Sequence, residues 1–545
     1  MVYVLGITHP ISWNTAAVLL EDGHVIAAVE EERFVRIKHA PRMIPHNAIE
    51  FVLQKAGIKH NDIDMIAVSW NGPHDENSIN DTIKKTSFTD SEQVAEKAFW
   101  TVSVEKEVLL IKYLQKRFIA SKIFFVDHHI SHAASACYVS GFDNSLFLTL
   151  DGRGEFESGL MGIYQNGEME VVRRFGLGES LGNMYSNFTS LIGYRGHTDE
   201  GKVMGLAPYG KPMEYLFDIA NVKEGRIKID WKKIDHLRNN NKFQGDDPTK
   251  DERKDFAATI QHILEKCVLQ LVSDLSSISN TTNICLAGGC ALNIDMNGSI
   301  LKSGLVKDIF VQPAAHDAGC ALGAALHIYH QHSGNSSFKM KHAFLGPQWQ
   351  NDEIKEFLEN SGLKHELLDD TPSEIAEILS KNKIIGWFQG SSEFGPRALG
   401  SRSILANPTE MHMWSRVNQV KGREYWRPLA PSIVEEDVEK FFASHDTKSP
   451  FMLLRFDVKE EKIHDIPATV HVDKTARPQT VSKETNVTYW NLLKEFEKIK
   501  GVPLLINTSF NLRGEPIVNS PQDAVKTFYN SDIDYLCMGE YLVHK

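Results

Sequence analysis

The chain has 545 residues, 42% of them hydrophobic and 24% charged, so it is too long for one ordinary domain and too balanced for a disordered or fibrous protein. Its 59 basic and 71 acidic residues give a net charge of −12, which argues against a broad nucleic-acid-binding surface. No apolar run reaches the roughly 18 residues of a membrane span, and the first residues lack a signal-peptide pattern. We therefore expect a cytoplasmic protein that binds neither nucleic acid nor membrane. Its six cysteines include no C-x-x-C pair and predict neither disulfides nor structural zinc.

A weak internal repeat predicts the architecture of the first half. Residues 2–34 read as a strand and a hairpin with Asp22-Gly23 at the turn, and residues 146–175 repeat this plan with Asn166-Gly167. Two hairpin-led α/β halves facing each other are typical of the actin, hexokinase and heat-shock ATPase superfamily, in which each hairpin loop grips a nucleotide phosphate. The alternative is two unrelated hairpins in a mixed sheet.

Two further strand–loop–helix elements favour the nucleotide interpretation. Residues 283–293 (NICLAGGCALN) combine a short strand, the Gly288-Gly289 turn and a helix start, and residues 311–326 repeat the pattern. Glycines there allow close backbone approach to a ligand, and a helix N-terminus offers free N–H groups. Alone, such a turn is more often just a tight strand-to-helix connection. After two phosphate-type hairpins, the two elements predict the adenosine end of an ATP site.

Composition also divides the chain. Residues 71–120 and 211–260 read as insertions, and a polar stretch at 331–348 interrupts the α/β pattern. We expect a first domain at 1–345 and a second at 346–545, in which the loops become basic.

The string DHHISHAAS predicts a metal site. His128 and His132 share one face of a helix, whereas His129 points elsewhere, and Asp151 and Asp317 follow at strand ends. Two imidazoles and two carboxylates suit Fe²⁺, with Mn²⁺ as a second choice. The alternative is a polar helix start. The glutamate of a zinc protease motif is absent, which disfavours peptide hydrolysis.

Charged loops supply the remaining candidates. Residues 197–210 place Asp199, Glu200 and Lys202 around a glycine. These charged side chains could contact a ligand. The slightly favoured alternative is an ion pair within a solvated loop. Three basic motifs in the second half predict a site for a small phosphorylated or carboxylated ligand, held by forked guanidinium bonds and amide or hydroxyl donors. Its candidate residues are Arg397, Arg402, Lys421, Arg423, Arg427, Asn507, Ser509, Asn511 and Arg513.

Eight ordered strings together resemble the NodU/CmcH-type O-carbamoyltransferases nearly end to end. They are HHISHAASA, LDGRGE, DEGKVMGLAPYG, AGGCALN, AAHDAGCALGAA, EFGPRALGSRSILA, REYWRPLAP and NTSFNLRGEPIV. The resemblance implies an N-terminal unit similar to the transferase of tRNA threonylcarbamoyl-adenosine synthesis, with iron held by His128, His132, Asp151 and Asp317. It also implies a C-terminal unit similar to the YrdC-type carbamoyl-adenylate synthases, with Lys421/Arg423 and Ser509/Asn511 as its K-x-R and S-x-N elements.

The resemblance implies a two-step reaction. Carbamoyl phosphate and ATP, with Mg²⁺, give carbamoyl-adenylate and pyrophosphate, and a hydroxyl of a natural-product acceptor then attacks the adenylate. The expected ATP contacts are Asp151, Gly152, Lys202, Gly288, Gly289 and Asn293. His9 in the first hairpin loop, or else Asp199, is the candidate general base, although Pro10 departs from the family's usual first loop. A homodimer is also expected from the family.

Two other functions stay open. An ATPase or small-molecule kinase on the same fold would leave the basic C-terminal motifs unused and would release ADP. A nucleotide-regulated binding protein would bind without turnover. The acceptor is not identified by any motif; the acidic balance would tolerate a cationic natural product.

Overall fold

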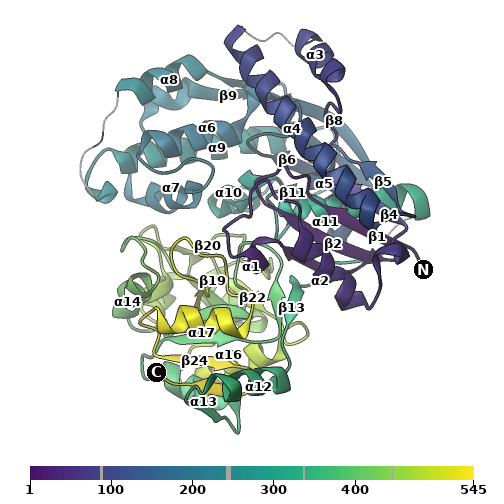
Figure 1. Cartoon of the computed structure of the whole chain (residues 1–545). Helices are drawn as coiled ribbons and strands as arrows, with labels where there is room; N and C mark the ends of the chain where they lie inside the picture. Colours follow the sequence, from purple (N-terminus) through teal and green to yellow (C-terminus); the bar gives the residue numbers. More distant parts are fainter. Residues whose placement is uncertain (86–89, 241–242, 244–246, 335–337, 445) are drawn as a thin grey trace.

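Each predicted hairpin begins a five-stranded sheet, and the two sheets share one strand order (Figure 1). The computed structural model describes residues 1–545 except 86–89, 241–242, 244–246, 335–337 and 445. The first sheet has the order β3 (His24–Glu30), β2 (Ala16–Glu21), β1 (Tyr3–Ile7), β4 (Met65–Val68), β5 (Lys122–Phe125). The second has the order β8 (Glu168–Gly176), β7 (Glu157–Gln165), β6 (Asn144–Leu150), β11 (Asn283–Ala287), β12 (Asp308–Val311).

The matching turns confirm the predicted repeat. Asp22 and Gly23 have φ of 46° and 79°, and Asn166 and Gly167 have φ of 52° and 88°. Two successive positive φ angles define the tight hairpin turn that follows the twist of the strands, and asparagine, aspartate and glycine adopt them at low cost. In both sheets the first strand pairs antiparallel with the hairpin and parallel with the next strand. The alternative of two unrelated hairpins is therefore wrong.

Two helices of small residues fill the space between the sheets. They are α5 (His128–Ser140) and α11 (Ala318–Ser333). A Cβ atom at Gly6 of β1 would lie 2.0 Å from the carbonyl oxygen of Ala321, and one at Gly323 would lie 1.7 Å from that of Ser131. Backbone thus touches backbone on both sides of α11, which ties the start of α11 to the start of α5.

The two predicted insertions lie outside these sheets. Residues 71–120 hold α3 (Glu76–Lys85) and α4 (Asp90–Arg117), and Trp70 and Trp100 anchor them in a small buried cluster. Residues 211–260 hold β9 (Ala220–Lys223), β10 (Arg226–Ile229), α8 (Trp231–Asn240) and the start of α9 (Arg253–Ser276). Other helices of this half are α1 (Glu32–Val35), α2 (His46–Ala56), α6 (Leu181–Leu191), α7 (Glu200–Leu206) and α10 (Ile294–Lys302).

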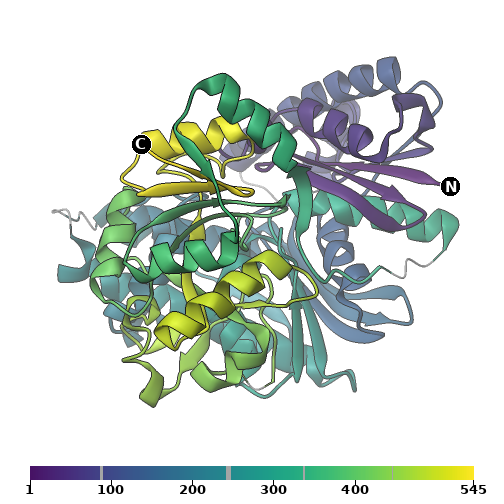
Figure 2. The same ribbon diagram turned by 90° about the horizontal axis from the view of Figure 1, so that it is seen from below.

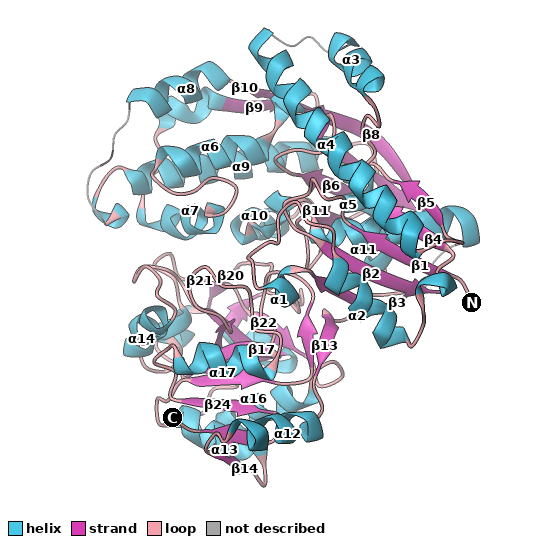
Figure 3. Ribbon diagram, viewed as in Figure 1, coloured by secondary structure: helices cyan, strands magenta, loops and turns pink. Residues whose placement is uncertain are grey.

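The C-terminal half is built on one eight-stranded sheet, covered by helices (Figures 2 and 3). Its order is β14 (His365–Leu367), β25 (Tyr541–Val543), β24 (Tyr535–Met538), β15 (Ile385–Phe388), β17 (Arg402–Ala406), β23 (Leu504–Ser509), β18 (Ala430–Val434), β22 (Gln479–Val481). Two small sheets accompany it: β13 (Phe344–Gln348) with β16 (Ser391–Glu393), and β19 (Phe442–Ala443) with β20 (Phe456–Val458) and β21 (Thr475–Ala476). The helices are α12 (Asn351–Ser361), α13 (Thr371–Ser380), α14 (His412–Val420), α15 (Val438–Phe441), α16 (Val487–Lys500) and α17 (Pro521–Tyr529).

The expected fold class, a duplicated α/β unit followed by a second α/β unit, is confirmed by these sheets. The two units share a continuous buried core, in which Phe310 and Phe451 pack with ring centroids 6.0 Å apart. The predicted division at 345 falls within β13, and residues 335–337 of the polar stretch lie outside the described residues. Where the structure is described, it contains no helix with the length and apolar character needed to span a membrane.

Candidate functional sites

The predicted metal ligands converge from three elements of the N-terminal unit. His128 and His132 lie in the first turns of α5, Asp151 follows β6, and Asp317 precedes α11. The Nε2 atom of His132 lies 3.1 Å from Oδ2 of Asp151, and the Nε2 atom of His128 lies 3.9 Å from the same oxygen. The Oδ1 atom of Asp317 lies 3.8 Å from His128 Nε2. Four donor atoms within 4.8 Å of one another form a group that could hold one cation.

Backbone donors orient both carboxylates in this group. The amide of Gly152 donates to Oδ1 of Asp151 at 2.6 Å, and the amide of Trp13 donates to Oδ2 of Asp317 at 2.8 Å. The other oxygen of each carboxylate is left facing the imidazoles. One oxygen of each carboxylate accepts from a backbone amide and the other is available to a cation. The four donor atoms are therefore held in place before any cation binds.

The residues fit a divalent metal. Both ring nitrogens of His128 are buried without a hydrogen-bond partner among the described residues, a costly state that a cation at Nε2 would relieve. Burial alone would lower the pKa of His132, but Cys320 and Asp151 outweigh burial and raise the pKa to about 9. Two nitrogen and two oxygen donors suit Fe²⁺ or Mn²⁺.

The glycine turn predicted to bind ATP lies against this group. Gly288 has φ of 88°, and a Cβ atom there would lie 2.3 Å from the carbonyl oxygen of Leu150. A Cβ atom at Gly289 would lie 3.0 Å from Oδ1 of Asp151. Asn293 instead caps α10, since its side chain accepts from the amide of Met296 at 2.9 Å.

The two candidate bases have structural partners. His9 is fully buried, its Nδ1 accepts from the amide of Ile11 at 3.2 Å, and its Nε2 lies 3.7 Å from Oε2 of Glu107. Burial and then repulsion from His74 lower the pKa of His9 to about 3, so its imidazole is neutral. Asp199 pairs with Lys202 at 3.1 Å, which supports the loop ion-pair interpretation of this motif. Lys202 also pairs with Glu424 of the C-terminal unit at 3.2 Å.

The second candidate site is a cavity of about 140 Å³ between the two units, here called the interface cavity. The N-terminal unit contributes residues of α7 and α10, among them Gly205 and Asp295. The C-terminal unit contributes a set of arginines with neighbouring polar residues: Arg397, Arg423, Arg427, Arg455, Arg477, Asn507 and Ser509.

Positive charge dominates the interface cavity. Burial and then repulsion from other arginines lower the pKa of Arg397 to about 10 and that of Arg423 to about 9, and hold the pKa of Arg477 well below its usual range. Asp295 pairs with Arg455 at 3.3 Å, but burial raises the pKa of this carboxyl to about 7. Such a cluster of buried cations is a ready site for a multiply charged anion.

Several predicted anion ligands do not line this cavity. The Lys421 ammonium donates to the carbonyl of Ser509 and to both the carbonyl and the side chain of Asn511, so it fastens the turn after β23. The guanidinium of Arg402 donates to carbonyl groups that include those of Gln389 and Gly390. Arg513 is exposed. For these residues a binding role stays a prediction.

Comparison with known proteins identifies the family. The family model described as carbamoyltransferase N-terminus matches residues 3–326, and the one described as carbamoyltransferase C-terminus matches residues 376–545. The chain belongs to the carbamoyltransferase family. It is 41% identical to nodulation protein NolNO of Sinorhizobium fredii over 97% of this chain and 78% of that protein. It is also 41% identical to nodulation protein NolO of Bradyrhizobium diazoefficiens over 77% of this chain and 79% of that protein.

The family match supports carbamoyl transfer as the general chemistry of this chain. Among solved structures, full-length HypF in its phosphate- and nucleotide-bound form is similar at a TM-score of 0.37 and 11% identity, covering 61% of this chain and 56% of that chain.

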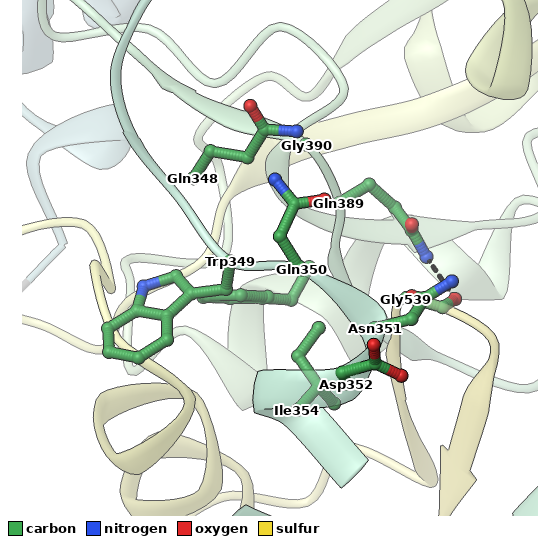
Figure 4. A pocket seen from close by; sticks show the side chains of 10 residues that line it. Gln348, Trp349, Gln350, Asn351, Asp352, Ile354, Gln389, Gly390 and Gly539 are labelled. Carbon is green, nitrogen blue, oxygen red and sulfur yellow. Dashed lines mark hydrogen bonds between the residues drawn. The ribbon is translucent and has the colours of Figure 1, made fainter. Parts of the chain in front are cut away.

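This carbamoyltransferase has a larger cavity elsewhere, of about 360 Å³, at the start of α12 (Figure 4). Gln348, Gln350 and Gln389 line it, and Gln389 donates to the carbonyl of Gly539 at 2.7 Å. None of the predicted site residues is in its lining among the described residues. The guanidinium of Arg402 donates to the carbonyl oxygen of Gly390, a residue that lines this cavity.

Several residues of these sites were not predicted from the sequence, and three of them show why. Arg477 shares the Arg-Pro dipeptide with Arg427, and this repeated dipeptide was the available signal. Glu107 lies on the insertion helix α4, where no motif marks it, yet its Oε1 is 2.6 Å from Nδ1 of His74 and its Oε2 faces His9. Cys320 lies beside both metal-site histidines, and a cysteine between alanine and glycine reads as a core residue.

Proposed function

We propose that this carbamoyltransferase is an ATP-dependent O-carbamoyltransferase that works in two steps at two sites. In the interface cavity, water hydrolyses carbamoyl phosphate to carbamate and inorganic phosphate. A carbamate oxygen then attacks the α-phosphate of ATP, which gives carbamoyl-adenylate and releases pyrophosphate. At the metal group, a hydroxyl of a natural-product acceptor attacks the carbamoyl carbon and AMP leaves.

The observation that carries the first step is the excess of buried cations. Burial, followed by repulsion from neighbouring arginines that include Arg427, lowers the pKa of Arg397, Arg423 and Arg477. Asp295, the carboxylate in the lining, already pairs with Arg455. Bound phosphates would remove this repulsion. The same guanidinium groups would stabilise the charge that grows on a departing phosphate in the transition state.

The metal group supports the second step. A metal bound by His128, His132, Asp151 and Asp317 supplies Lewis acidity toward an adenylate phosphate. Gly152 and Trp13 hold the carboxylates in the binding orientation through their amides. The Gly288-Gly289 turn lets backbone pack closely against Leu150 and Asp151. A glycine turn before a helix start is a common phosphate-binding element.

Deprotonation of the acceptor is assigned to His9 or Asp199. His9 is neutral and so has the protonation state of a base, but its Nδ1 is engaged by Ile11 and its side chain is buried. Asp199 pairs with Lys202 at 3.1 Å. Either role requires local rearrangement when the acceptor binds. Natural-product acceptors, Mg²⁺ with ATP, a homodimer and a cytoplasmic location remain parts of this proposal.

The deciding experiment incubates the purified protein with ATP and carbamoyl phosphate without acceptor. Pyrophosphate is assayed enzymatically and carbamoyl-adenylate by mass spectrometry. We expect both products from wild type and from His132→Ala, and neither from Arg423→Gln. The matched control is Arg416→Gln, because Arg416 pairs with Asp534 at 2.6 Å and lies outside the cavity lining.

Other outcomes identify the alternatives. ADP and phosphate formed equally by wild type and Arg423→Gln would reject the proposal in favour of a kinase-like ATPase. Nucleotide binding without any turnover would favour a nucleotide-regulated binding protein.

A further inference from the structure

The three histidines of α5 differ in how their ring nitrogens are satisfied. His129 has a partner on each side, since its Nε2 lies 3.2 Å from the carbonyl oxygen of Glu157 and its Nδ1 lies 3.4 Å from Oγ1 of Thr149. The Nε2 atoms of His128 and His132 face Asp151. The Nδ1 atoms of His128 and His132 are buried and have no hydrogen-bond partner among the described residues.

Cys320 lies beside both imidazoles. Its sulfur and one nitrogen from each of His128 and His132 are within 4.8 Å of one another, and its Sγ is 3.8 Å from the carbonyl oxygen of His128. All three side chains are buried. The placement is fixed by the helix contact one turn later, because Gly323 brings α11 against the backbone of Ser131.

Elimination assigns the contact to Nδ1. The two nitrogens of an imidazole flank one carbon and point in diverging directions. In both histidines Nε2 is the nitrogen directed at the carboxylates, which leaves Nδ1 for the sulfur. A histidine that binds a metal through one nitrogen almost always donates the N–H of the other to an acceptor, usually a carboxylate or carbonyl oxygen. For His128 and His132 no such oxygen is present among the described residues.

We propose that the sulfur of Cys320 is a shared acceptor for the Nδ1–H groups of His128 and His132, and that it positions both imidazoles for metal binding. The sulfur has more than one lone pair and a large radius, so it accepts from both rings at once. Protonation at Nδ1 then leaves the Nε2 lone pair of each ring directed at the metal position. Cys320 is thus a positioning residue and not itself a metal ligand. This inference rests on the metal site proposed above.

The test measures metal affinity on the full-length protein stripped with chelator. Mn²⁺ is titrated calorimetrically into wild type, Cys320→Ala, Cys320→Ser and Cys267→Ala. Loss of such a supporting partner typically weakens metal binding about 10- to 100-fold, which is the result expected for Cys320→Ala. Cys320→Ser keeps an acceptor, the smaller hydroxyl oxygen, and should lose less metal affinity than Cys320→Ala. Cys267, a buried cysteine of α9 outside the metal group, is the matched control and should leave the affinity unchanged.

Three outcomes separate the possibilities. Equal Mn²⁺ affinity in wild type and both Cys320 variants would overturn the proposal while the metal site stands. A sulfur-to-cobalt charge-transfer band in the Co²⁺-loaded wild type would also overturn it, because Cys320 would then be a direct ligand. Absence of Mn²⁺ and Co²⁺ binding by wild type would overturn the metal site itself, and this inference with it.

Discussion

Replacing Gly323 with alanine tests the packing that assembles the metal group. The new methyl group would lie 1.7 Å from the carbonyl oxygen of Ser131 and 2.8 Å from the amide nitrogen of Ser135. A carbon–oxygen contact needs about 3.3 Å, so the two helices must separate by roughly 1.6 Å. Both clashing atoms belong to the backbone, so no side-chain rotation relieves the overlap.

The expected cost follows from two opposing effects. Overpacking of this kind costs about 3 kcal/mol, the upper end of the usual range, because rigid backbone must move. Alanine in place of glycine within a helix stabilises the folded protein by about 1 kcal/mol. We therefore expect Gly323→Ala to lower the free energy of unfolding by about 2 kcal/mol. Because α5 carries both histidines and α11 follows Asp317, we also expect weaker Mn²⁺ binding.

Urea unfolding, followed by circular dichroism, and Mn²⁺ calorimetry measure the two effects. Gly201→Ala in α7 is the control, because no heavy atom lies within 4 Å of its added methyl group. This control should be as stable as wild type or up to about 1 kcal/mol more stable. The reasoning is refuted if Gly323→Ala matches the control in stability and wild type in Mn²⁺ affinity.

Three further predictions concern other parts of the molecule. Arg477→Gln should reduce the rise in melting temperature that pyrophosphate gives wild type, and an unchanged rise would place the anion elsewhere. Asn297→Ala should cost about 2 kcal/mol in urea unfolding, since its amide donates to Ala291 of its own unit at 2.8 Å and across the units to Leu453 at 2.9 Å. Burial lowers the pKa of His9 from 6.5 to about 3. Between these two pH values the imidazole of His9 binds a proton in the unfolded chain but not in the folded protein. Stability is therefore lost as pH falls from about 6.5 toward 3, and melting curves of His9→Asn should lose less over that window; parallel curves would contradict this.

The sequence by itself determined the local elements and the residues with unusual chemistry. Asp22-Gly23 and Asn166-Gly167 specify tight turns through their own backbone preferences, so the hairpins and their repetition were predictable. The spacing of His128 and His132 places them on one helix face without any tertiary information. The clustering of arginines after residue 396 likewise indicated anion binding in an acidic chain.

The tertiary structure decided which of these residues meet. Arg402 and Lys421 look like ligand-binding cations in sequence, yet carbonyl groups of their own unit take up their donors. Arg477 enters the interface cavity from a segment with one weak signal, and Cys320 reaches the histidines because Gly323 permits a backbone contact. Turn and helix preferences act between near neighbours in the chain, whereas these contacts join residues from 13 positions apart, for Arg402 and Gln389, to 192 positions apart, for Cys320 and His128. Packing decides whether a charged or sulfur-bearing side chain bonds within the protein or stays available to a ligand. Sequence spacing does not encode this difference.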